Sequence, residues 1–110
     1  DIRECMEDIA NSLIPIPAKE NNKFWKQSAR SLLCGELTGL YKQKGIHNLS
    51  ELINEILSRD TRELVTELMD RAVPKAIEVK LLSSFKNLAD ETLSGVVQEE
   101  QETVSVMLRK

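Results

Sequence analysis

The sequence predicts an all-α fold, a compact bundle of about six helices in a single domain spanning residues 1–110. Apolar residues recur every three or four positions through nearly the whole chain, which is the period of an amphipathic helix. Only four glycines and three prolines interrupt this pattern, and no stretch alternates convincingly as a strand does. A chain of 110 residues is also long enough to bury one core without metals or disulfides.

The first helix is expected over residues 1–12, and a segment that contains Pro15 and Pro17 ends it. A residue that precedes proline is disfavoured in the helical region, so the chain leaves the helix there. A second and longer helix is expected from an Asn22 cap to about Lys44, with Gly45 just past its end. The apolar side of the first helix carries Ile2, Cys5, Met6 and Ile9.

One apolar stripe follows the second helix, and we expect it to form the centre of the core. Its members are Trp25, Ala29, Leu32, Leu33, Leu37 and Leu40. Trp25 is expected to anchor the core, so that its truncation to alanine costs about 3 to 5 kcal/mol. The alternative for Trp25 is a surface hot spot. Phe24 lies about 100° around the helix from Trp25 and is expected to cover the proline segment instead.

Two capping patterns predict the next pair of helices. Asn48 followed by Glu51, and Asp60 followed by Glu63, each place a side-chain acceptor three residues before an acid. The fourth helix should end near residue 72 because Pro74 follows. The apolar residues of these two helices are Leu49, Leu52, Ile53, Ile56 and Leu57, then Leu64, Val65, Leu68, Met69 and Ala72.

Two further segments keep the helical period to the end of the chain. The fifth presents Ile77, Leu81, Leu82 and Phe85, and the sixth, from about Asp90, presents Leu93, Val96, Val97, Val104, Met107 and Leu108. Short links between six helices favour a bundle over an extended array.

Composition and motifs exclude several function classes. Apolar residues at 41% and charged residues at 30% are typical of a soluble domain, and no apolar run approaches the roughly 20 residues of a membrane span. Two cysteines are too few for a metal or disulfide framework, which favours the reducing cytoplasm. The glycines do not fit a phosphate-binding loop, His47 stands without a second imidazole, and Cys34 lacks an evident base. We therefore expect no catalysis, cofactor or metal in this chain.

Charge is distributed unevenly along the sequence. Residues 19–44 carry six bases and two acids, a net of +4, whereas residues 87–108 carry five acids and no base. The residues that we expect to bind a partner are Lys19, Lys23, Lys26, Arg30, Glu99 and Glu102. Three of these bases, Lys23, Lys26 and Arg30, lie within about 60° of arc on one flank of the second helix and should project together. The alternative for this basic flank is an ordinary solvated helix face.

Two acids interrupt apolar stripes. Glu36 falls within the stripe of the second helix and Glu100 within that of the sixth. A buried carboxylate without a partner is costly. We therefore expect each of these acids either to be paired or to lie at a solvated edge of the domain. The partner expected for Glu36 is an arginine from another helix. The alternative is that each marks an interface with a missing domain.

The segment Asn22-Lys23-Phe24-Trp25-Lys26-Gln27-Ser28-Ala29-Arg30-Ser31-Leu32-Leu33 resembles the Phe-Trp, Ala-Arg, Leu-Leu pattern that opens the all-alpha domain of TraG/TraD-type coupling proteins of type IV secretion. The Leu-Ile-Pro turn at residues 13–15 and the stretch from Glu91 to Val97 resemble further family features in the same order. Departures from the pattern are Lys23, where the family often has proline or an acid, and Glu36, within a usually apolar run.

The resemblance implies a domain excised from a larger RecA-like coupling ATPase, an expectation that fits a chain beginning with Asp1. In such a protein, ATP and Mg²⁺ belong to a hexameric motor domain at the inner membrane. The all-alpha domain faces the cytoplasm and, alone, is expected to be a monomer. Its implied role is to dock a relaxase, an adaptor or an effector protein, in conjugative DNA transfer or effector secretion. The alternatives are contact with nucleic acid and a structural spacer between motor subunits. A net charge of −3 and few aromatic residues disfavour nucleic acid.

Overall fold

Six helices follow one another along the chain in the computed structural model, which describes residues 2–19, 21 and 23–108, with no side-chain description for residues 3, 107 and 108. The helices are α1 (Ile2–Leu13), α2 (Lys23–Lys44), α3 (Leu49–Ser58), α4 (Thr61–Arg71), α5 (Ile77–Lys86) and α6 (Asp90–Leu108). The described residues include no strand, and the predicted all-α fold is confirmed. None of the described helices is both long and apolar enough to cross a membrane.

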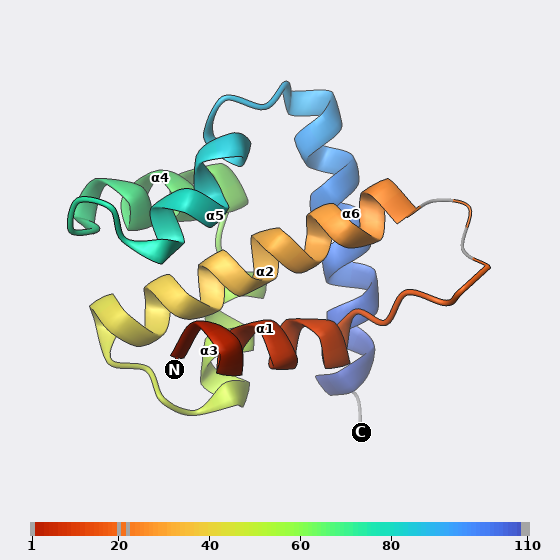
Figure 1. Cartoon of the computed structure of the whole chain (residues 1–110), viewed down its shortest axis with the longest axis horizontal. Helices are drawn as coiled ribbons and strands as arrows, with labels where there is room; N and C mark the ends of the chain where they lie inside the picture. Colours follow the sequence, from red (N-terminus) through yellow and green to blue (C-terminus); the bar gives the residue numbers. More distant parts are fainter. Residues whose placement is uncertain (1, 20, 22, 109–110) are drawn as a thin grey trace.

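Helix α2 runs through the middle of the molecule, and the other five helices pack around it (Figure 1). Residues 32–40 of α2 are all buried, so this stretch is covered on every side rather than along one stripe. Cys34, which the stripe places on the opposite side of the helix, is therefore also in the core. The prediction of a one-sided amphipathic helix is wrong for this stretch. Helices α5 and α6 also pack against the sides of α2 that carry polar or small residues instead of the apolar stripe.

Two glycines allow neighbouring helices to approach α2 closely. A Cβ atom at Gly35 would stand 2.6 Å from Cδ2 of Leu82 on α5, and one at Gly39 would stand 2.9 Å from Cδ1 of Leu68 on α4. Carbon atoms in packed cores lie about 3.5 to 4.0 Å apart, so any side chain at these positions would overlap its neighbour. Glycine at residues 35 and 39 thus sets the distance of two helices from α2.

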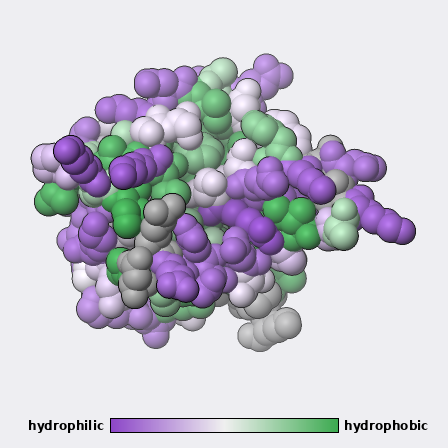
Figure 2. All heavy atoms as spheres, in the orientation of Figure 1, coloured by the Kyte–Doolittle hydropathy of each residue, from purple (hydrophilic) through white to green (hydrophobic). Residues whose placement is uncertain are grey.

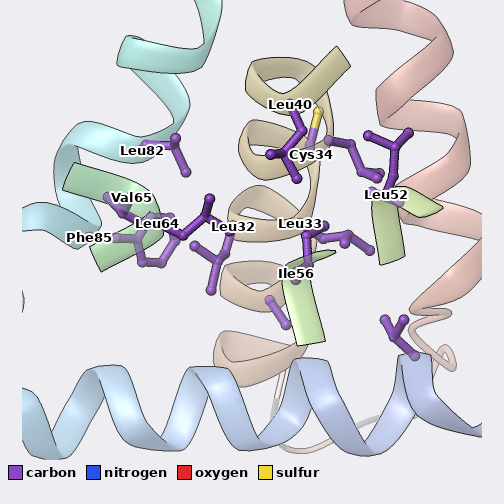
Figure 3. Packing of buried hydrophobic residues seen from close by; sticks show 14 of the residues in the cluster. Leu32, Leu33, Cys34, Leu40, Leu52, Ile56, Leu64, Val65, Leu82 and Phe85 are labelled. Carbon is purple, nitrogen blue, oxygen red and sulfur yellow. The ribbon is translucent and has the colours of Figure 1, made fainter. Parts of the chain in front are cut away.

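The predicted core of α2 is largely confirmed. Ala29, Leu32, Leu33 and Leu40 have no exposed surface. Figure 3 shows the leucines between side chains of the surrounding helices, with Leu64, Val65, Leu82 and Phe85 on one side and Leu52 and Ile56 on another. The core thus draws on apolar residues of every helix.

Trp25 contributes to the core as predicted, but it is not one of the fully buried residues. Its indole is only partly buried and packs against the edge of the core, over Gly95 of α6. Phe24 is 56% exposed and meets Trp25 edge to face, with ring centroids 5.0 Å apart. The predicted contact of Phe24 with the proline segment stays a prediction. The positions of Trp25 and Phe24 explain why both remain partly exposed. Both lie in the first turn of α2, which begins at Lys23 and extends beyond the helices that cover the middle of α2.

The helix ends agree with the capping patterns. Asn48 and Asp60 accept hydrogen bonds from the backbone N–H groups of Glu51 and Glu63, each at 3.1 Å. Gly45 has a φ of 66°, as a residue just past a helix end often does. The predicted Asn22 cap lies outside the described residues. Cys5 and Leu49 are exposed and not on the buried faces predicted for them.

Candidate docking surface

A shallow groove separates the first turn of α2 from the middle of α6. Its lining residues are Trp25, Gly95, Gln98, Glu99 and Glu102, and we call it the α2–α6 groove. The floor is the indole of Trp25, because Gly95 offers no side chain to cover it. An apolar floor with polar edges is a common form of binding surface.

Both signs of charge occur at the edges of the α2–α6 groove. Lys26 donates a 2.7 Å hydrogen bond to Glu99, and both side chains are about one-fifth exposed. On the same stretch of α6, Gln98 donates a hydrogen bond to Glu102 at 3.0 Å. The structure therefore brings together three residues of the predicted partner-binding set, Lys26, Glu99 and Glu102. In the sequence, more than 70 positions separate Lys26 from the two acids.

An exposed pair of residues extends this surface past the groove. Phe24 packs against the floor residue Trp25, and Lys23 precedes it as another exposed residue of the first turn of α2. Lys19 is exposed in the link before α2. Phe24 was not among the residues predicted to bind a partner, and its adjacency to Trp25 in the sequence was the only available signal.

Arg30 does not take part in this surface. Its Nε donates to the carbonyl oxygen of Ile14 at 2.6 Å, and its Nη2 lies 3.5 Å from the carbonyl oxygen of Asn11. The guanidinium therefore binds carbonyls at the end of α1, which helical geometry leaves without partners. The expectation that Lys23, Lys26 and Arg30 project together is wrong, because the first remains exposed while the others are engaged within the domain.

Most other described bases are engaged with acids. Ion pairs join Lys42 to Glu78, Lys44 to Glu55 and Glu67, Arg59 to Glu55 and Glu67, Arg62 to Asp90, Arg71 to Glu67, and Lys86 to Asp70. Figure 2 shows the result on one face, where hydrophilic side chains dominate and apolar ones form small separate patches.

Glu36 and Glu100 lie next to each other in the core and not at a surface. Their exposed fractions are 0% and 1%, so the alternative of an interface with a missing domain is wrong. The expected arginine partner for Glu36 is also wrong, since the neighbouring group is the second carboxyl. Burial, and then the charge of Glu100, raises the pKa of Glu36 well above its ordinary value. Burial raises the pKa of Glu100 to about 7.

The single histidine of the chain stacks on an aromatic ring. His47 is exposed and stacks on Tyr41, with ring centroids 4.4 Å apart, which agrees with a surface histidine. Within the described part of the chain, no three histidine, cysteine or acidic residues converge as a metal site.

A family model, the DNA-binding domain of the type IV secretion-system coupling protein, matches residues 2–94. The chain belongs to this family. The match covers α1 to α5 and the first turn of α6 in this coupling-protein domain, and it ends just before Gly95. Glu99, Glu100 and Glu102 thus lie beyond the matched residues, whereas Trp25, Lys26 and Glu36 lie within them. Comparison with curated proteins and with solved structures finds no match.

Proposed function

We propose that this domain docks protein cargo, or an adaptor that carries the cargo, for a type IV secretion coupling protein. The contact surface is the α2–α6 groove together with Phe24 and Lys23. One observation carries this proposal: the exposed ring of Phe24 stands edge-on to the groove floor at Trp25, beside charges of both signs. Aromatic residues that remain partly exposed next to a polar rim are typical of the centres of protein interfaces.

Charge favours a protein partner over duplex DNA. Affinity for a phosphate backbone comes from cations that replace its counterions, so a binding face needs a surplus of free basic groups. Here the chain has a net charge of −3, and many described bases are already paired with acids. A partner with both signs of charge, such as a protein surface, fits this distribution better.

Contact with nucleic acid is the second candidate, and the family description supports it. The matching model is that of a DNA-binding domain. Phe24 exposes a ring on which a base of single-stranded DNA can stack, and Lys19 and Lys23 lie near it in the sequence. This candidate uses the same end of α2 as the first, so binding assays have to separate them.

The proposal places the domain in a longer coupling ATPase whose motor domain binds ATP and Mg²⁺ and forms the hexamer. The domain itself then faces the cytoplasm as a monomeric unit without cofactor or catalysis. This setting serves either conjugative DNA transfer or effector secretion. Sequencing of the coding region on both sides tests it, since a phosphate-binding loop upstream is expected.

Two measurements on the purified domain separate the candidates. Calorimetry with a purified relaxase, adaptor or effector of the same secretion system should show saturable binding if the domain docks protein. Fluorescence anisotropy with labelled single-stranded and duplex DNA should show weak binding that is lost between 50 and 200 mM salt. Tight DNA binding without protein binding would replace the first candidate by the second, and no binding in either assay would favour a structural spacer.

Variants locate the contact. Phe24→Ala and Lys23→Glu should each weaken cargo binding at least tenfold while helical content stays unchanged, because both side chains are exposed. Lys80→Glu, an equal charge reversal at an exposed position of α5, is the matched control. Unchanged affinity for the cargo in both Phe24→Ala and Lys23→Glu would reject this surface.

A further inference from the structure

Two carboxyl groups face each other at the contact between α2 and α6. Glu36 and Glu100 have exposed fractions of 0% and 1%. All four of their carboxyl oxygens are buried without a hydrogen-bond partner among the described residues. Buried polar atoms in folded proteins are nearly always paired, so four such oxygens at one point require an explanation.

A proton supplies that explanation. Ionised carboxylates only accept hydrogen bonds, and two of them cannot bond to each other. With one proton on either group, an O–H of one glutamate donates to an oxygen of the other and the repulsion of two like charges disappears. The pair is therefore compatible with its buried position only while it holds at least one proton.

Among the side chains that the structure describes, the helices packed around α2 and α6 bring no cation to the pair. Toward the core, α1 presents Met6 and Ala10, α3 presents Leu52 and Ile56, and α4 presents Leu64 and Leu68. The core residues of α5 are Leu82, Phe85 and Glu78, whose carboxylate is bound by Lys42 and Gln43.

Other charged groups of these helices are engaged elsewhere. Lys26 of α2 bonds Glu99 of α6, Arg30 of α2 bonds carbonyls of α1, and Arg62 of α4 bonds Asp90 of α6. The half-buried acids Glu55 of α3 and Glu67 of α4 face Lys44 and Arg59. Cys34 is the other buried titratable side chain of α2.

We propose that Glu36 and Glu100 form a proton-dependent latch that holds the second half of α6 against α2 and releases it as the pair loses its protons. Loss of protons places negative charge in an apolar interior between these two helices. The helices then separate or admit water at this contact, while α4 and α5 remain packed on the other side of α2. Regulation of the domain by pH follows from this arrangement whatever cargo it binds.

The pair should make the stability of the fold depend on pH in the direction opposite to that of most surface acids. Both folded-state pKa values are raised, mainly by burial, that of Glu100 to about 7. The stabilising effect of protonation is fully present below the unfolded pKa, near 4.5, and is lost as pH rises through about 7. The domain should therefore loosen across the neutral range and on to mildly alkaline pH.

Carboxyl ¹³C NMR of the wild-type domain tests the latch directly. The signals of Glu36 and Glu100 should both titrate well above the ordinary glutamate pKa of 4.5, that of Glu100 near 7. Signals that both titrate near 4.5 would overturn the proposal. Amide hydrogen exchange at pH 8.5 should show protection lost first in residues 95–108 and the middle of α2. An even loss of protection over all six helices would also overturn it.

Glutamine variants provide the second test, because glutamine is neutral and close in shape to a protonated glutamate. The melting temperature of the wild type should fall by about 10 °C from pH 5.5 to pH 8.5. In the double variant Glu36→Gln with Glu100→Gln, most of this decrease in melting temperature should disappear. Glu91→Gln, at an exposed position on the same helix, is the control and should keep it. Equal pH dependence in the double variant and the control would contradict the latch.

Discussion

The indole of Trp25 lies so close over Gly95 that a Cβ atom at residue 95 would stand 2.7 Å from Cζ3 of the ring. This contact joins the first turn of α2 to the middle of α6 and forms the floor of the α2–α6 groove. Position 95 is therefore glycine for a packing reason, although glycine inside a helix costs about 1 kcal/mol relative to alanine.

Gly95→Ala should displace the indole and expose it to water. We expect a red shift of the tryptophan fluorescence, and no gain in stability despite the better helix propensity of alanine. Because Trp25 is the single tryptophan, emission reports on this site alone. Ser94→Ala, at the exposed neighbouring position, is the control and should leave the emission unchanged. An unshifted spectrum for Gly95→Ala would show that the ring does not depend on this glycine.

Gly35→Ala should destabilise the domain more than Gly95→Ala. The new Cβ would meet Cδ2 and Cγ of Leu82 at 2.6 and 2.7 Å, and Leu82 is fully buried with no room to move. Overpacking of this kind costs about 1 to 3 kcal/mol, which exceeds the gain in helix propensity. Urea denaturation measures the loss, with Ser31→Ala on the exposed side of α2 as control.

A double variant checks the cause of this loss. If the overlap with Leu82 is responsible, Gly35→Ala combined with Leu82→Val should lose less free energy of unfolding than the two single variants added together. Strict additivity would mean that Gly35 acts through something other than its contact with α5.

Arg30→Ala should loosen α1. The guanidinium donates to the carbonyl oxygen of Ile14, and a charge-assisted hydrogen bond of this kind contributes about 1.5 to 3 kcal/mol. Chemical denaturation gives the total loss, and hydrogen exchange should locate it in residues 2–13. Lys23→Ala removes one exposed base from the same helix and should leave stability nearly unchanged. If both variants behave alike, Arg30 is an ordinary surface base after all.

Stability should also fall in acid, through Glu78. Burial opposes ionisation of this carboxyl, but hydrogen bonds from Lys42 and Gln43 outweigh burial and lower its pKa. A lowered folded-state pKa contributes stability that is present above the unfolded value near 4.5 and is lost as pH falls through the folded value. Together with the raised pKa values of Glu36 and Glu100, this predicts a stability maximum at mildly acidic pH.

Glu78→Gln separates this acid effect from general acid denaturation. Its melting temperature should change less between pH 5 and pH 3 than that of the wild type, because Lys42 no longer has an ionised partner to lose. Glu91→Gln, at an exposed position of α6, is the matched control. If the melting temperature of Glu78→Gln changes between pH 5 and pH 3 as much as that of the wild type, Glu78 is not the cause of the loss of stability in acid.

The sequence predicted much of the fold because helical signals are local. The caps at Asn48 and Asp60, the stop before Pro74 and the apolar period of each segment act within a few residues. The same local reasoning was wrong for Cys34, and it did not indicate that Trp25 would remain partly exposed. Whether a helix is covered on one side or on all sides depends on partners that come from distant parts of the chain.

The candidate site was predicted only in part for the same reason. Lys26, Glu99 and Glu102 were each singled out, but their meeting across α2 and α6 depends on how these helices cross. Arg30 belongs to the same basic run as Lys26, and the structure directs it to the end of α1. Charge runs in a sequence therefore indicated which residues were unusual and not which of them remain free.

By itself, the sequence determined the six helices, their ends and most of the apolar core, because hydrogen bonding, capping and the 3.6-residue period are properties of neighbouring residues. Only the tertiary structure decided that Glu36 meets Glu100 and that Trp25 rests on Gly95. Such contacts depend on the distance and crossing of two helices, which packing of the whole core determines.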